Sequence, residues 1–451
     1  MRELAEKYDL RVPRYTSYPT APHFTEAVGP ETYRQWLTEV PTDKRLSLYL
    51  HIPYCDELCW FCGCLTKITR RYQPIADYVA VLLAEIERVA DLLPGRFAVG
   101  HIHWGGGSPT TVSAADFERI TSVLHERFAV AEDAEHAVEL DPRTTDEAYV
   151  KTLAACGVTR ASIGVQDFDP RVQEAVNRVQ PYEVTATAIE RLRAAGVPEV
   201  NMDLMYGLPH QTAESVADTV ERALAFEPSR IALFGYAHVP WMKKHQRMMP
   251  EDALPDADER WRQYDAAEAR LTAHGYTPIG LDHYAAPGDL MAEALRDGTL
   301  HRNFQGYTTD REPVLLGFGA SAIGTLPQGY VQNTHRVHAY RRAVMDDGDL
   351  ATCRGVPVSE EDRFRRRIIE TLMCHMEVDL AAVAGEFGRD PAELADDVER
   401  LRPLEEDGVL VRDGWHLRVP DEARVLVRLV AAAFDQYLEE AGGERRHSRA
   451  V

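Results

Sequence analysis

Apolar residues in the central part of the chain form short runs that alternate with longer amphipathic segments. The short runs are rich in Val, Ile, Leu and aromatic residues, and they predict β-strands at residues 46–52, 99–104, 136–140, 160–165, 199–205, 230–236 and 276–281. Apolar positions with helical spacing predict helices in the gaps, including residues 75–93 and 213–226. Alternating strands and helices are typical of a parallel sheet, so we predict an α/β domain over residues 45–350.

Small or reactive residues stand at the end of almost every predicted strand. They are Cys55, residues 105–108, Glu139, Gln166, Asp203, and Ala237 with His238. In a barrel or partial barrel of parallel strands, the carboxyl ends open onto one face. We therefore predict a partial (β/α)6 TIM-like barrel whose strand ends line one shared cavity.

The regions on either side of this barrel have different patterns. Residues 1–44 include PRYTSYPTAP, which is too rich in Pro, Ser and Thr for a helix, so we expect an arm over the barrel mouth. Residues 351–440 predict helices at 360–375, 378–387 and 391–405, a hairpin at 409–419 that turns at Asp413 and Gly414, and a last helix at 421–440. This mainly helical, winged-helix-like domain lacks a basic recognition helix, which favours a structural or lid role over DNA binding. We expect residues 441–451 to be a disordered tail.

Composition and charge narrow the classes of function. The chain has 451 residues, of which 45% are hydrophobic and 27% charged, as in ordinary globular proteins. A net charge of −22 argues against nucleic acid as a partner, because nucleic-acid binding depends on cations that pair with phosphates. No apolar run approaches the ~20 residues of a membrane span, and the first residues do not resemble a secretory signal. We therefore expect a cytoplasmic protein with no membrane span, and we expect a monomer.

Four of the seven cysteines fall within ten residues, in the segment YLHIPYCDELCWFCGC. An odd number of clustered cysteines in a chain without a secretory signal indicates a metal site or thiol chemistry rather than a disulfide framework. Cys55, Cys59 and Cys62 have the spacing C-x3-C-x2-C, and three thiolates suit a [4Fe-4S] cluster that leaves one iron open. The alternative is a four-cysteine zinc site that includes Cys64, although the short C-x-C spacing makes it awkward. The nearby His51, His101 and His103 are more simply structural than metal ligands.

The cysteine spacing, with Phe61 directly before the last cysteine, resembles the signature of radical S-adenosylmethionine (SAM) enzymes. The glycine-rich segment HWGGGSPT fits the same superfamily. Nearly the whole chain resembles the oxygen-independent coproporphyrinogen III oxidases of that superfamily. The matching blocks are PRYTSYPT, YLHIPYCDELCWFCGC, HWGGGSPTT, VELDPR, IGVQDFDPRVQEAVNRVQ, NMDLMYGLP, YAHVP, HRNFQGYTT and LLGFGASAI. Nine blocks in the family's order are far more specific than the cysteines alone.

The resemblance implies a radical SAM type of barrel and a set of cofactor-binding residues. Cys55, Cys59 and Cys62 would hold the [4Fe-4S] cluster. One SAM molecule would contact Tyr49, Gly106, Glu139 and Ile323, and a second would contact Phe61, Gly107, Ser108, Gln166, Arg178, Asp203 and Ala237. Ser108 departs from the expected Thr but keeps the hydroxyl. Without the resemblance, Glu139 and Asp203 could equally be surface acids, and the glycine run a plain turn that lets backbone N–H groups approach a ligand.

The resemblance also implies the reaction and its partners. An electron from the reduced cluster cleaves SAM to methionine and a 5′-deoxyadenosyl radical, which removes a hydrogen atom from a propionate of coproporphyrinogen III. Loss of CO2 follows, an external acceptor takes the remaining electron, and a separate donor reduces the cluster. Candidate cations for the four propionates are Arg14, Lys67, Arg70, Arg71, Lys243, Lys244 and Arg302.

Two other functions are compatible with the cysteine loop. One is that of the related haem-binding chaperones, which transfer haem and do not decarboxylate a substrate. The other is a zinc-stabilised binding module without redox activity. The blocks PRYTSYPT and HRNFQGYTT favour the enzyme, since we expect the chaperone type to lack both.

Overall fold

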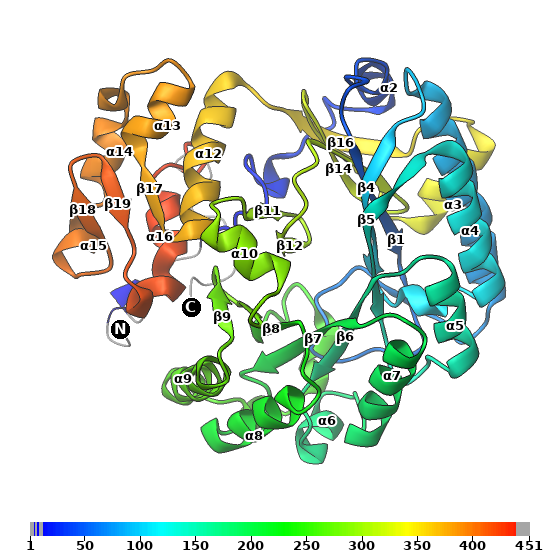
Figure 1. The fold of residues 1–451 in the computed structure, drawn as a ribbon, viewed down its shortest axis with the longest axis horizontal. Coiled ribbons are helices and arrows are strands. Elements are labelled where there is room, and N and C mark those ends of the chain that lie inside the picture. Colours follow the sequence, from blue (N-terminus) through cyan, green and yellow to red (C-terminus); the bar gives the residue numbers. More distant parts are fainter. Residues whose placement is uncertain (1–3, 5–6, 9–11, 439–451) are drawn as a thin grey trace. The chain divides into compact units, whose positions relative to one another are not determined.

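The computed structural model describes residues 4, 7–8 and 12–438, and the chain divides into two compact units (Figure 1). The barrel unit comprises Phe24–His274 and Glu312–Pro357, and the C-terminal unit comprises Met1–His23, Gly275–Arg311 and Val358–Val451. Three segments are grouped differently from the predicted boundaries: residues 24–44 and 351–357 belong to the barrel unit, and residues 275–311 to the C-terminal unit. The predicted tail lies outside the described residues.

Six parallel strands, each beside the next in chain order, form the central sheet of the barrel unit. They are β1 (Leu46–Ile52), β4 (Ala98–Gly106), β5 (Ala129–Leu140), β6 (Arg160–Gln166), β7 (Glu199–Tyr206) and β8 (Arg230–Gly235). This arrangement confirms the predicted succession of βα units and the partial barrel. Because the strands are parallel, their carboxyl ends lie along the same edge of the sheet.

Further strands extend the sheet beyond β1. There, β13 (Val314–Phe318) pairs in parallel with β1, and β14 (Ile323–Leu326), β15 (Gly329–Asn333) and β16 (Thr352–Pro357) follow as antiparallel neighbours. The sequence analysis does not predict these strands, because here the alternation of strands with long helices stops. A separate small ribbon pairs β2 (Tyr54–Cys55) with β3 (Lys67–Ile68).

Helices follow the strands of the barrel unit, as the amphipathic pattern predicts. They are α3 (Gln73–Leu92), α4 (Ala114–Arg127), α5 (Glu147–Ala155), α6 (Pro170–Ala175), α7 (Tyr182–Ala194), α8 (Ala213–Leu224), α9 (Ala257–Ala273) and α11 (Val337–Arg341), while α2 (Pro30–Thr38) precedes β1. Side-chain caps start several of them: Ser113 accepts from the N–H of Asp116 at the start of α4, and Thr212 forms a capping box at the start of α8. The fully buried Trp104 of β4 stacks on Phe117 of α4, with ring centroids 4.3 Å apart. Such contacts form the core between sheet and helices.

The C-terminal unit contains the predicted helices and hairpin with local differences. Its elements are β9 (Thr277–Ile279), β10 (His283–Ala285), α10 (Leu290–Arg296), β11 (His301–Asn303), β12 (Gly306–Thr308), α12 (Glu360–His375), β17 (Glu377–Asp379), α13 (Leu380–Glu386), η6 (Pro391–Leu394), α14 (Ala395–Glu399), α15 (Arg402–Glu406), β18 (Val411–Asp413), β19 (His416–Arg418), η7 (Asp421–Leu426) and α16 (Val427–Ala432). The predicted strand at 276–281 contains the shorter β9, which forms an antiparallel hairpin with β10. The predicted helix at 391–405 is divided, since Pro403 suits the first turn of a new helix and not a helix interior.

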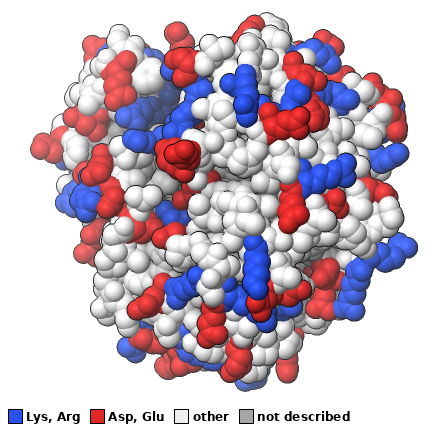
Figure 2. Space-filling model, turned by 45° about the vertical axis from the view of Figure 1, so that its right-hand side comes forward, with Lys and Arg blue, Asp and Glu red and all other residues white. Residues whose placement is uncertain are grey.

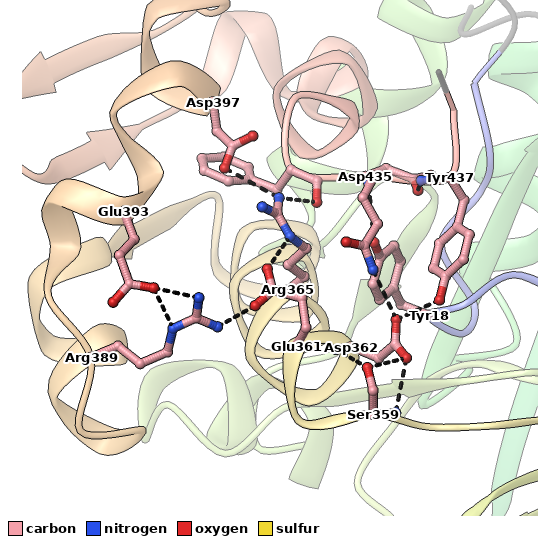
Figure 3. Close-up of polar contacts among 12 residues, drawn as sticks. Tyr18, Ser359, Glu361, Asp362, Arg365, Arg389, Glu393, Asp397, Asp435 and Tyr437 are labelled. Atoms are coloured by element: carbon pink, nitrogen blue, oxygen red, sulfur yellow. Dashed lines mark hydrogen bonds and ion pairs between the residues drawn. The ribbon is translucent and has the colours of Figure 1, made fainter. Parts of the chain in front are cut away.

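Polar contacts join α12 to chain segments near both ends of the C-terminal unit (Figure 3). The Nη1 atom of Arg365 lies 3.2 Å from Oδ2 of Asp397 and donates to the carbonyl oxygen of Phe434 at 3.0 Å. The backbone N–H of Gln436 donates to the Tyr18 hydroxyl at 3.1 Å. The PRYTSYPT segment is therefore bound to residues just after α16.

Charge on the visible surface is mixed in sign. Figure 2 shows Lys and Arg side chains interspersed with Asp and Glu, without a continuous basic surface on the face that it draws. In the part of the chain that the structure describes, no helix has the length and apolarity needed to cross a membrane. The exclusion of nucleic acid, the cytoplasmic location and the monomeric state stay predictions.

Candidate active site

The three predicted cluster ligands lie on one loop at the carboxyl end of the barrel strands. Cys55 belongs to β2, while Cys59 and Cys62 lie in the segment between β2 and β3. Backbone hydrogen bonds close this cysteine loop (residues 55–67), including Lys67 N–H to Pro53 O at 2.7 Å. All three thiols are free, with Cys59 buried and the other two partly buried. The loop therefore keeps three thiols available to a ligand.

Side chains from two distant segments bind the backbone of the cysteine loop. Asn177, just after α6, donates from Nδ2 to the carbonyl oxygen of Leu58 at 2.8 Å. The His245 ring, in η3 (Lys244–Met248), lies 2.8 Å from the carbonyl oxygen of Cys62. The loop is thus fixed on both sides by the barrel.

The thiols influence each other's protonation. Burial, together with the neighbouring Cys62 and Cys59, raises the pKa of Cys55 to about 12. The pKa of Cys62 is lowered to about 6, first by a hydrogen bond from the Cys64 side chain and further by the Cys64 backbone N–H, 3.4 Å from its Sγ atom. Mutual effects of this kind require that the thiols lie near one another. Such a group of sulfur donors suits a soft metal centre, whose binding releases the thiol protons.

The spacing of the donors distinguishes a cluster from a single ion. Among the described residues, no group of three or more His, Cys, Asp or Glu side chains is placed to hold one metal ion. A structural zinc site needs four ligands around one ion. The thiolates of a [4Fe-4S] cluster bind different irons, so they need not converge on one point. Three thiols on one loop are compatible with the thiolate ligands of such a cluster, and the role of Cys64 stays a prediction.

Residues predicted for the first SAM molecule meet at the ends of β1, β4 and β5. The Tyr49 ring stacks on His103 with centroids 5.9 Å apart, and Nε2 of His103 lies 3.3 Å from Oε1 of Glu139. Gly106 has a φ of +113° and lies against the His51 ring, where a Cβ would come within 2.6 Å of a ring carbon. Glycine is therefore required at this position.

Ile323 reaches the same area through β13. Tyr49 of β1 pairs with Gly317 of β13. The Gly317 backbone in turn lies so close to Ile323 that a Cβ added at Gly317 would be 2.5 Å from the carbonyl oxygen of Ile323. The structure thus brings all four residues predicted for the first SAM molecule to neighbouring strands.

Arg178 lies beside the cysteine loop, Gln166 and Arg178 both lie against Gly164, and each has a buried polar atom without a hydrogen-bond partner. Nη2 of Arg178 donates to Gly164 O at 2.6 Å, and Nη1 lies 3.4 Å from Oδ2 of Asp141 and 3.5 Å from Sγ of Cys59. Gln166 has a φ of +70°, and its Oε1 atom is buried without a hydrogen-bond partner, as is Nε of Arg178. Unpaired buried polar atoms are costly, so they indicate a place where a polar ligand would bind.

The remaining residues predicted for the second SAM molecule lie at the same strand ends. Asp203 of β7 pairs with Gly164 of β6 on one side and Ala232 of β8 on the other. Ala237 follows β8, and Phe61 packs in part against an apolar cluster beside it. These positions are compatible with one site, but the roles of the residues stay predictions.

The glycine-rich loop differs from the expectation that its N–H groups face a ligand. Gly107 N–H donates to Ile52 O at 2.8 Å, and Ser108 N–H donates to Tyr54 O at 2.7 Å. A Cβ at Gly107 would lie 2.5 Å from the carbonyl oxygen of Tyr54. These two N–H groups therefore attach the glycine loop to the start of the cysteine loop. The Ser108 hydroxyl is buried, 3.1 Å from that of Thr110.

The sequence analysis did not single out two polar residues of this site. Asp141 faces Arg178, and its pKa is lowered, against the effect of burial, first by the Arg178 charge and then by Arg143. The only sequence signal was its place two residues after Glu139 in the VELDPR block. Asn177 stands next to Arg178 in another block, but its contact with the cysteine loop depends on the fold.

The candidate propionate-binding cations have varied surroundings. In the barrel unit, Arg70 forms an ion pair with Glu57. In the C-terminal unit, Nη2 of Arg302 donates to Arg14 O at 3.2 Å, while its Nε and Nη1 atoms are buried without a partner. Binding of propionate by any of these residues stays a prediction.

The fold and the cysteine loop define the class of protein: this chain is a member of the radical SAM superfamily, whose family model matches residues 49–223. A model of the HemN C-terminal domain matches residues 358–426. The chain is 49% identical over 450 residues to the oxygen-independent coproporphyrinogen III oxidase of Bradyrhizobium diazoefficiens, covering 100% of this chain and 99% of that protein. It is 39% identical to the oxidase of the same name from Escherichia coli, covering 99% and 98%. This chain belongs to the oxygen-independent coproporphyrinogen III oxidase family.

A solved structure is similar over almost the same extent. Coproporphyrinogen III oxidase (HemN) from Escherichia coli, described as a radical SAM enzyme, superposes with a TM-score of 0.90 at 37% identity. The match covers 95% of this chain and 100% of that one. It confirms the predicted α/β fold with its helical C-terminal domain.

Proposed function

We propose that this protein converts two propionate side chains of coproporphyrinogen III to vinyl groups and so gives protoporphyrinogen IX. Each conversion removes a hydrogen atom from the β-carbon, releases CO2 and delivers one electron to an external acceptor. The observation that supports this most strongly is the three-cysteine loop, with Arg178 beside it and unsatisfied atoms on Arg178 and Gln166, in a chain similar to these oxidases over its full length.

The proposed ligands of the [4Fe-4S] cluster are Cys55, Cys59 and Cys62. When bound and reduced, the cluster would supply the electron that cleaves SAM and so provides the species that removes hydrogen. Nη1 of the Arg178 guanidinium lies 3.5 Å from Sγ of Cys59, so a positive charge lies beside this proposed ligand. Asp141 in turn holds Arg178 in place.

We propose two SAM sites on neighbouring strand ends. Tyr49, Gly106, Glu139 and Ile323 would contact the first molecule. Phe61, Gly107, Ser108, Gln166, Arg178, Asp203 and Ala237 would contact the second. The Oε1 acceptor of Gln166 and the Nε donor of Arg178 are available for polar groups of the second molecule. Anaerobic equilibrium dialysis of the cluster-loaded protein with labelled SAM should give two bound equivalents, and one equivalent would contradict the second site.

Anaerobic decarboxylation tests the proposed reaction directly. Protein with a reconstituted cluster, SAM, a chemical reductant for the cluster and an added one-electron acceptor should release two CO2 per coproporphyrinogen III. A haem titration of the same preparation tests the chaperone function. Haem binding at one equivalent without CO2 release would contradict the proposal.

A further inference from the structure

A buried amide, Gln246, links the cysteine loop to the end of β8. Gln246 lies in η3 and is 1% exposed. Its Nε2 group donates to the carbonyl oxygens of Phe61 and Ala237, both at 3.2 Å, and its Oε1 accepts from Val239 N–H at 2.6 Å. Both N–H donors and the acceptor oxygen are used, so the partners fix the orientation of the amide.

The same segment binds the next peptides of the loop. Beside the contact of His245 with Cys62 O, the Nζ group of Lys243 donates to the carbonyl oxygen of Cys64 at 3.3 Å. Residues from one short segment thus bind three carbonyl groups around the third cysteine. Of these three residues, Gln246 is the buried one, and it also reaches the end of β8.

We propose that Gln246 is a positioning residue that fixes the peptide before Cys62 to the end of β8. This inference rests on the proposed assignment of the three cysteines as cluster ligands. Its consequence is that one side chain sets the separation between the third ligand and Ala237, a proposed contact of the second SAM molecule. Movement of the Phe61 carbonyl would therefore disturb cluster binding and SAM binding together.

Two substitutions remove the link in different ways. Gln246→Glu keeps the shape and the acceptor oxygen but loses both donors and places an oxygen against two carbonyl oxygens. Gln246→Met has similar length, carries no charge and loses all three hydrogen bonds, so it serves if the first variant does not fold. The matched control is Gln263→Glu, since Gln263 is also fully buried, accepts from Gly207 N–H at 2.8 Å and donates to Gln211 O at 3.0 Å.

Cluster retention and thiol accessibility are the main measurements. Under anaerobic conditions, the cluster-loaded Gln246 variants should release iron to a ferrous chelator about tenfold faster than wild type, because both variants lose the two hydrogen bonds that Nε2 of Gln246 donates. In the metal-free protein, Cys62 should be alkylated several-fold faster relative to the buried Cys374, measured by peptide mass spectrometry. The KM for SAM should rise in the cluster-loaded variants. Gln263→Glu should leave all three quantities near the wild-type values.

Either of two results would overturn the proposal. One is iron release and Cys62 alkylation within about twofold of wild type in a folded Gln246 variant. The other is an equal acceleration in Gln263→Glu, which would show a general effect of burying a carboxylate. The wild-type CO2 assay fails separately if the proposed reaction is wrong, and wild-type protein without iron after reconstitution would refute the cluster-ligand assignment itself.

Discussion

Glu85 of α3 offers a test of how a buried carboxylate changes the stability of the barrel unit with pH. It is 2% exposed and accepts hydrogen bonds from Gly319 N–H at 2.7 Å, Asn333 Nδ2 at 2.6 Å and the Tyr340 hydroxyl at 2.7 Å. Burial raises the pKa of Glu85 to about 7, although these hydrogen bonds act in the opposite direction. The side chain also holds the loop that leads to Ile323, a proposed SAM contact.

The size of the pH-dependent change in the free energy of unfolding follows from the difference between the pKa values of Glu85 in the folded and unfolded chain. From the ordinary value of 4.5 up to about 7, the folded protein binds more protons at Glu85 than the unfolded chain does. The stability that this group contributes is therefore fully present below pH 4.5 and is lost as pH rises to about 7. The shift corresponds to on the order of 3 kcal/mol in the free energy of unfolding.

Urea unfolding, followed by tryptophan fluorescence at a series of pH values, measures this change. A Glu85→Gln variant carries an amide that cannot titrate, so the difference in unfolding free energy between wild type and variant should shift by about 3 kcal/mol from about pH 4.5 to about pH 8. Other titrating groups cancel in this difference. A matched control is Glu87→Gln in the same helix, whose side chain is 43% exposed, so that the effect of burial is separated from that of removing a carboxylate. A constant difference for the Glu85 variant would refute the reasoning.

Three further substitutions test the site and the packing. Cys59→Ser should abolish both the visible absorbance of the reconstituted cluster and SAM cleavage, and retention of both would contradict the ligand assignment. Burial lowers the pKa of His136 to about 3, so its neutral ring accepts a hydrogen bond from the Trp104 side chain at 2.8 Å. His136→Leu leaves the buried Trp104 N–H without this acceptor and should lower the free energy of unfolding in urea by about 1–3 kcal/mol. Unchanged stability would contradict this role. Arg365→Met should destabilise the C-terminal unit by about 2 kcal/mol, since the buried Asp397 loses one of its two arginine partners. Chemical denaturation followed by circular dichroism measures the free energy of unfolding, and a loss below about 0.5 kcal/mol would contradict this prediction.

Much of the barrel could be predicted because local patterns carry its information. Short apolar runs in β1 and β4 to β8 are separated by amphipathic helices, and each run ends in a polar or small residue. Parallel topology then implies that those ends lie together. The spacing of the cysteines is also a local pattern, and it predicted the metal centre.

The less predictable features depend on contacts between distant residues. The contact of Gln246 with Phe61 joins positions 185 residues apart, and no local pattern indicates it. The glycine loop shows the same limit, since its sequence permits N–H groups to face either a ligand or the protein. Only the fold shows that Ile52 and Tyr54 accept from two of them.

The C-terminal unit illustrates a different limit. Residues 275–311 continue the alternation of apolar and polar segments, so the sequence groups them with the barrel. Their grouping with residues 358–451 depends on long-range packing, such as the hydrogen bond from the Tyr307 hydroxyl to Met373 O at 2.9 Å. Sequence periodicity does not report such packing.

The C-terminal unit is built from three separate segments of the chain, which constrains the order in which the two units can fold during synthesis. Tyr15 donates to Asp435 at 3.0 Å, and Arg428 donates to Pro13 O at 2.9 Å, so Pro13 and Tyr15 have partners made more than 400 residues later. A nascent chain on the ribosome can contain every residue of the barrel unit once residue 357 has emerged. The segment around Pro13 and Tyr15, although translated early, cannot form these contacts until the ribosome has almost finished the chain.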